Sequence, residues 1–80
     1  MDIVRLSSTS FLISTEAYRK GTSVIYRETT HSVDEVTHDI TLTHTDYVVK
    51  TYIPETQYVQ QRVRYSSFED AFNCLKESSE

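Results

Sequence analysis

Alternation of apolar and polar residues is the feature that most limits how this 80-residue chain can fold. Three segments alternate with a period of two: FLISTEAY (11–18), TSVIYRET (22–29) and YVQQRVRY (58–65). This is the period with which side chains alternate between the two faces of a β-strand. The pattern therefore predicts strands. DIVRL, near the start, is compatible with either a short strand or a frayed terminus.

The only glycine of the chain predicts the position of one turn. Gly21 lies in YRKGT, between the first two alternating segments. A tight hairpin turn needs a residue with positive φ, which glycine adopts without a steric penalty. We therefore expect an antiparallel hairpin centred on this residue.

The segment 37–53 contains a change of alternation. The even positions of THDITLTH are expected to share one face: His38, Ile40, Leu42 and His44. From Tyr47 onward the apolar residues occupy odd positions instead. A straight strand over the whole segment would exceed about 50 Å at about 3.3 Å per residue. We expect a turn or a bulge near Thr45 and Asp46, which leaves open one bent strand or two strands.

The last part of the chain, SSFEDAFNCLKESSE, has a helical period. Ser67 is a suitable N-cap, and Phe68, Phe72 and Leu75 recur with Ala71 at the spacing of one helical face. We expect these three large side chains to be buried against the sheet. The predicted fold class is α+β: a small antiparallel meander of four to six strands with one C-terminal amphipathic helix on one face, in a single domain, 1–80.

The charge and the cysteine count indicate the environment and the kind of partner. Twelve acidic and eight basic side chains give a net charge of −4, which disfavours general binding to a phosphate backbone and favours a partner with a basic surface. Cys74 is the only cysteine, so no internal disulfide forms. There is no apolar run of about 20 residues for a membrane span. We expect a cytoplasmic protein without a membrane partner.

No catalytic, cofactor or metal motif is recognisable in the sequence. Zinc ligands in small domains usually come in closely spaced pairs, which His31, His38, His44 and Cys74 do not form. His38, His44 and Asp46 could share an ion only if the strand bends between them; otherwise the histidines flank an apolar centre where the sheet meets solvent. Cys74 is expected to be a core or flank residue of the final helix and not a nucleophile. We therefore predict no enzyme activity, no cofactor and no metal.

Two surfaces are candidates for binding. The first is acidic and consists of Asp34, Glu35, Asp39 and Asp46, in a stretch without Lys or Arg from residue 28 to 49. We expect it to contact a host protein or ribonucleoprotein with a basic surface. The alternative combines rings and cations that could stack on single-stranded bases or could be ordinary cross-strand pairs: Tyr18, Arg19, Tyr26, Arg27, Arg62, Arg64 and Tyr65. An edge strand could also pair with a second copy.

The chain resembles the small acidic proteins that phages and other mobile elements encode to inhibit host machinery, among them anti-CRISPR proteins. The resemblance covers the size, the charge, the strand-turn-helix ending RVRYSSFEDAFNCL and the lack of catalytic motifs. It carries over no functional residue, because members of that class share little sequence. It implies a mode of action: binding and blocking a complex of the bacterial host that handles nucleic acid.

Overall fold

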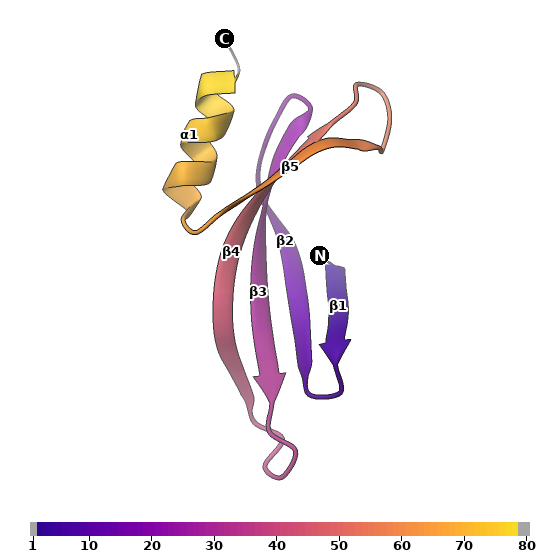
Figure 1. The fold of residues 1–80 in the computed structure, drawn as a ribbon, viewed down its shortest axis with the longest axis vertical. Coiled ribbons are helices and arrows are strands. Elements are labelled where there is room, and N and C mark those ends of the chain that lie inside the picture. The colour runs from indigo at the N-terminus through magenta and orange to yellow at the C-terminus, as the bar shows by residue number, and fades with distance from the viewer. Residues whose placement is uncertain (1, 79–80) are drawn as a thin grey trace.

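The computed structural model describes residues 2–78 as one five-stranded antiparallel sheet and one helix (Figure 1). The strands lie in sequence order, β1-β2-β3-β4-β5. Their bounds, with that of the helix, are β1 Asp2–Ser7, β2 Ser10–Lys20, β3 Ser23–Val33, β4 Ile40–Tyr52, β5 Val59–Tyr65 and α1 Phe68–Ser78. The α+β meander with a C-terminal helix predicted from the sequence is confirmed, and the segment DIVRL forms a strand.

Tight turns fix the register of the first two hairpins. Ser7 pairs with Ser10 across the first turn, and Lys20 pairs with Ser23 across the second. The second turn contains Gly21 at φ 59°, the left-handed conformation for which this residue is suited. The predicted hairpin is therefore present.

β4 is one continuous strand of 13 residues, with its irregularity earlier than predicted. Thr30 lies opposite His44, while its neighbour His31 lies opposite Leu42, so Thr43 is an additional residue in β4. The Thr43 hydroxyl donates to the Thr30 carbonyl at 3.1 Å. Because a bulge reverses the alternation, Leu42 and His44 face opposite sides of the sheet. The prediction that they share a face was wrong.

The core lies where α1 packs on the sheet. Ile25 and Val49 from the sheet and Ala71 and Leu75 from the helix are buried together, with Tyr18, Tyr47 and Tyr65 packed around them. We call the side of the sheet that carries these residues the helix face, and the other side the open face. Ser67 caps α1, since its hydroxyl oxygen accepts the N–H of Asp70 at 3.2 Å.

Two of the three helix side chains predicted to be buried lie at the border of this core. Phe68 and Phe72 are 39% and 37% exposed. Phe72 stacks on Tyr18 with ring centroids 5.2 Å apart, and Phe68 meets the Tyr47 ring edge to face at 5.8 Å. The prediction of burial is confirmed for Leu75 and was wrong for both phenylalanines, because the short helix rests on the sheet through its Ala71 and Leu75 stripe.

α1 covers only one end of the sheet (Figure 1). It packs on β3, β4 and β5, whereas β1 and the adjoining strand ends extend away from it in a molecule 51 × 26 × 15 Å in extent. We call this second part the uncovered half: residues 2–7, 10–14, 29–33 and 40–44. Among the described residues it is a single layer of sheet.

Candidate functional site

Apolar side chains cluster on the helix face of the uncovered half. The register pairs Ile3 with Ile13, Phe11 with His31, His31 with Leu42, and Val33 with Ile40, which places all of them on one face. We call the apolar members the apolar patch: Ile3, Phe11, Ile13, Val33, Ile40 and Leu42. Ile3, Ile40 and Leu42 each keep more than half of their surface exposed.

His31 is fixed inside this patch by its neighbours. Its ring stacks on Phe11 with centroids 5.2 Å apart and an interplanar angle of 16°. Its Nε2 lies 3.0 Å from the Thr29 hydroxyl, which also donates to the Ile13 carbonyl at 3.4 Å. These side-chain contacts join β2 and β3 at this point, so this part of the patch is preformed.

Residues 34–39 form the loop between β3 and β4, which we call the tip loop. It continues from the patch and carries three of the four predicted acids. The Asp34 carboxylate accepts the N–H groups of Val36 at 2.8 Å and Thr37 at 2.9 Å. These backbone hydrogen bonds hold the pKa of Asp34 below its ordinary value, and the bond from Thr37 has the larger effect. Glu35 and Asp39 are exposed, as is the apolar side chain of Val36.

Asp46, the fourth predicted acid, lies elsewhere, in an ion-pair cluster on the open face. It is opposite Glu28, and the two residues are only 8% and 7% exposed. Arg64 reaches both acids, with Nη1 3.4 Å from Asp46 and Nη2 3.6 Å from Glu28. Arg62 lies 3.7 Å from Glu28, and His44 Nε2 lies 2.8 Å from Asp46. The acidic surface predicted from the sequence is thus divided between two places.

The structure also distributes the predicted Tyr and Arg residues over both faces. Arg62 and Arg64 belong to the ion-pair cluster, and Arg19 pairs with Glu16 at 2.8 Å. The register places Tyr26 on the open face and Arg27 on the helix face. Tyr18 and Tyr65 pack against the core beneath α1. These seven residues do not form one continuous surface.

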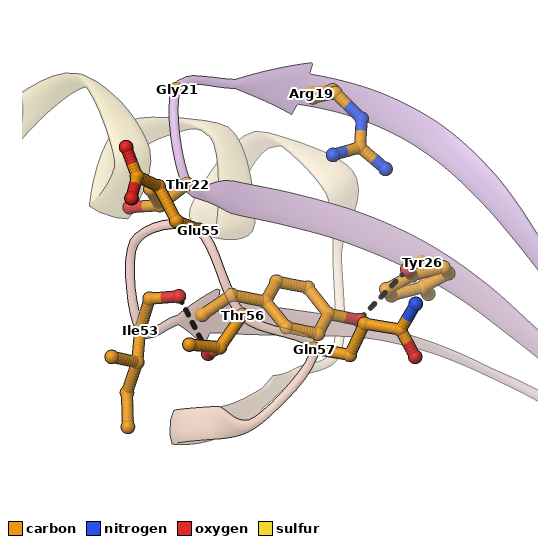
Figure 2. Close-up of a pocket in the computed structure, with 9 residues that line it drawn as sticks. Arg19, Gly21, Thr22, Tyr26, Ile53, Glu55, Thr56 and Gln57 are labelled. Carbon is orange, nitrogen blue, oxygen red and sulfur yellow. Dashed lines mark hydrogen bonds between the residues drawn. The ribbon is translucent and has the colours of Figure 1, made fainter.

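A groove of about 500 Å³ lies at the helix end of the sheet, between the Gly21 turn and the loop after β4 (Figure 2). Arg19, Tyr26 and Tyr52 line it. The two tyrosine hydroxyls are hydrogen-bonded at 3.0 Å, which together with burial raises the pKa of Tyr26 to about 12. Because the Tyr26 hydroxyl is hydrogen-bonded and its pKa is raised, this phenol is held neutral and is not activated as a nucleophile.

The histidines and the cysteine do not converge. His38 lies in the tip loop at φ 63°, and His44 lies on the open face beside Asp46. No three His, Cys, Asp or Glu side chains in the described part of the chain are grouped so that they could hold a metal ion. Cys74 is half-buried on α1. Among residues 2–78 there is no helix of the length and hydrophobicity that a membrane span requires.

Comparison of the chain with protein-family models, with curated proteins and with solved structures found no match. Its function must therefore be inferred from its own surfaces.

The sequence pattern did not predict the apolar patch, although the lengths of the elements contain the signal. A strand of 13 residues such as β4 extends about 43 Å at 3.3 Å per residue. The 11 residues of α1 extend about 16 Å at 1.5 Å per residue. One helix of this length cannot cover a sheet with strands this long.

Proposed function

We propose that this protein is a non-catalytic protein-binding module that contacts its partner through the apolar patch and the adjoining tip loop. The observation that supports this proposal is the exposure of Ile3, Ile40 and Leu42 on a single layer of sheet. Contiguous exposed apolar surface on a small protein usually marks an interaction site. The His31 and Phe11 stack reduces the conformational freedom lost on binding, because it holds part of the patch in place beforehand.

The charge of the tip loop beside the patch indicates the chemistry of the partner. The tip loop contributes the exposed carboxylates of Glu35 and Asp39, and no Lys or Arg occurs from residue 28 to 49. A complementary partner presents an apolar surface bordered by basic groups. The Asp34 carboxylate is used within the loop, so we assign the direct contacts to Glu35 and Asp39.

A basic surface is what nucleic-acid-handling complexes present to their substrate. An acidic module seated there would block access to it. Together with the resemblance to phage-encoded inhibitors, this supports an inhibitor of such a host complex, anti-CRISPR proteins being one example of the mode of action. The partner would be a host protein or ribonucleoprotein in the bacterial cytoplasm.

The alternative, direct binding of single-stranded nucleic acid, has less support. Arg19, Arg62 and Arg64 each contact a carboxylate within the protein. A phosphate that recruited Arg64 would leave two nearly buried acids without this cation, which is costly. The Tyr and Arg residues are, in addition, divided between two faces.

Capture from a bacterial lysate with matched variants tests the proposal. Leu42→Glu places a charge in the apolar patch, and Glu35→Lys with Asp39→Lys reverses the charge of the tip loop while keeping the Asp34 turn. Ile53→Glu, an exposed aliphatic residue outside the patch, is the control.

We expect wild type and the Ile53 variant to retain the same protein after nuclease treatment, and the other two variants to lose it. Retention that is independent of Leu42 contradicts the proposal. A mobility shift of single-stranded or double-stranded probes that is lost in an Arg62→Ala, Arg64→Ala variant would favour the alternative.

A further inference from the structure

The groove at the helix end of the sheet is separate from the proposed protein-binding surface. It lies beside the Gly21 turn, at the opposite end of β3 and β4 from the tip loop (Figure 1). Its volume of about 500 Å³ falls within the range of small-molecule sites, about 300–1,000 Å³. Its size therefore suits a small molecule, and its lining indicates which kind.

Three cations lie in one row of the open face beside this groove. The register places Arg19 of β2 opposite Val24, Val24 opposite Lys50 of β4, and Lys50 opposite Arg62 of β5. Like charges that face each other across adjacent strands, as Lys50 and Arg62 do, destabilise the pair. A negatively charged group bound beside this row would relieve the repulsion.

The acids of the protein compensate this row only in part. The Lys50 ammonium lies over the Tyr26 ring, 5.0 Å from its centroid, and no carboxylate of the described residues forms an ion pair with it. Arg62 lies 3.7 Å from Glu28, and this acid is shared with Arg64 at 3.6 Å. The row therefore keeps an excess of positive charge, although the whole chain is acidic.

Arg19 is the member of the row that lines the groove, and its guanidinium is held in place. Its Nε and Nη2 donate to Glu16 Oε1 at 3.2 and 2.8 Å, and Nη1 takes no part in this contact. Figure 2 shows the guanidinium on one side of the groove and the Glu55 carboxylate at the other end. A guanidinium fixed in advance binds an oxyanion with a smaller loss of conformational freedom.

The rings of Tyr26 and Tyr52 also line the groove. Their hydroxyls are hydrogen-bonded to each other at 3.0 Å, which fixes the two rings relative to one another. Because Lys50 lies over the ring of Tyr26, the ring of Tyr52 is the better surface for stacking. Planar rings bind to aromatic side chains in this way.

We propose that this groove binds a small molecule that carries a planar ring and an oxyanion, with the ring on Tyr52 and the oxyanion between Arg19 and Lys50. These two cations are two strands apart, about 10 Å between backbones, a gap that their long side chains and one oxyanion can fill. A nucleoside monophosphate and an aromatic carboxylic acid share this chemistry. The site does not rest on the proposed function, because it uses the open face and the other end of the sheet.

Titration of the wild type, followed by amide chemical shifts, tests the site with adenosine monophosphate and benzoate as probes. For each probe the ring alone (adenosine, benzyl alcohol) and the oxyanion alone (inorganic phosphate, acetate) are compared. We expect at least one probe to shift the amides of Gly21, Thr22 and Gln57 saturably and to bind at least about tenfold more tightly than either of its halves. The tighter probe identifies the source of the oxyanion.

Three results of this titration overturn the proposal, and none of them depends on a variant that folds. The first is no saturable shift with either probe at about 10 mM. The second is binding of inorganic phosphate or acetate as tight as that of the corresponding probe, because the ring then contributes nothing. The third is shifts confined to residues outside the groove.

Variants assign the contacts. Arg19→Gln removes the proposed oxyanion ligand, and Tyr52→Leu removes the ring while keeping an apolar side chain. Arg5→Gln, in β1 of the uncovered half, is the matched control, since it removes the same charge from an exposed arginine. We expect each groove variant to weaken binding about tenfold or more and Arg5→Gln to leave it unchanged. An equal loss in Arg5→Gln, or full binding by Arg19→Gln, overturns the assignment.

Discussion

Glu28 and Asp46 lie opposite each other on β3 and β4, and the guanidinium of Arg64 contacts both carboxylates. Two acids this close and this little exposed would repel each other without a cation, so the pair is retained only with its arginine. The same contacts remove Asp46 from the acidic surface and Arg64 from a nucleic-acid surface. The registers of β3 with β4 and of β4 with β5 therefore weaken part of both binding hypotheses drawn from the sequence.

Replacing Arg64 tests this interpretation through stability. Arg64→Met keeps much of the aliphatic stem but leaves Glu28 and Asp46 facing each other. We expect the free energy of unfolding to fall by about 1–3 kcal/mol. This is less than the value for fully buried pairs, because Arg64 is half-exposed. Adding Glu28→Gln should restore part of the loss. Arg27→Met, on the other face, should change stability by less than about 0.5 kcal/mol. Equal effects of the two arginine variants in urea unfolding would contradict the account.

Truncation of the helix side chains should follow their burial. Leu75 is buried in the core, so Leu75→Ala should cost about 2–4 kcal/mol. Phe72 packs on Tyr18 at the border and keeps contact with water, so Phe72→Ala should cost only about 1–2 kcal/mol. Denaturant unfolding of both variants measures the order, and a larger loss for Phe72 would show that the helix docks differently.

The hydrogen-bonded pair Tyr26 and Tyr52 predicts a loss of stability at alkaline pH. The folded state raises the pKa of Tyr26 to about 12, chiefly through the hydrogen bond to the Tyr52 hydroxyl. Because the raised pKa means that the fold favours the neutral phenol, this stabilisation is complete below the unfolded value of about 10 and is lost as the pH rises through 12.

Tyrosinate absorbance measured against pH checks this cause. In Tyr52→Phe the hydrogen bond is absent, and Tyr26 should titrate closer to 10. Tyr58→Phe, which alters an exposed ring in the following loop, should leave the titration of Tyr26 unchanged. A Tyr26 titration that does not move in Tyr52→Phe would contradict the assigned cause.

The tip loop should lose order at acidic pH. The hydrogen bonds from Thr37 and Val36 lower the pKa of Asp34 in the folded state. The stabilisation is therefore present above the unfolded pKa and is lost as the pH falls through the folded value. Amide chemical shifts of Val36 and Thr37 should titrate with a midpoint below about 3.9. This transition should disappear in Asp34→Asn and persist in Glu35→Gln, and a midpoint at or above the ordinary aspartate value would contradict it.

Local chemistry was sufficient to predict several elements from the sequence. Gly21 predicted its turn because few other residues adopt positive φ, and Ser67 predicted the start of the helix through its capping hydroxyl. Alternation predicted the strands. Each of these signals depends on neighbours in the sequence, which is why it is visible there.

Long-range register was not predictable in the same way. The bulge at Thr43 contains no glycine to mark it, and it alone decides that Leu42 joins the apolar patch while His44 turns to Asp46. The pairing of Asp46 with Arg64 depends on β5, 18 residues later in the chain. Surfaces made by several strands, unlike turns, need the register of all of them.

Hydrogen exchange of the protein alone and together with a protein retained in the lysate experiment tests the proposed function most directly, because it would locate the contact surface. Amides gain protection where a bound partner excludes water or prevents local opening. The account predicts gained protection in the tip loop, residues 34–39, and in the flanking strand ends 29–33 and 40–44, with no change in α1. Gained protection confined to β5 and the groove at Tyr26, with the tip loop unchanged, would contradict it.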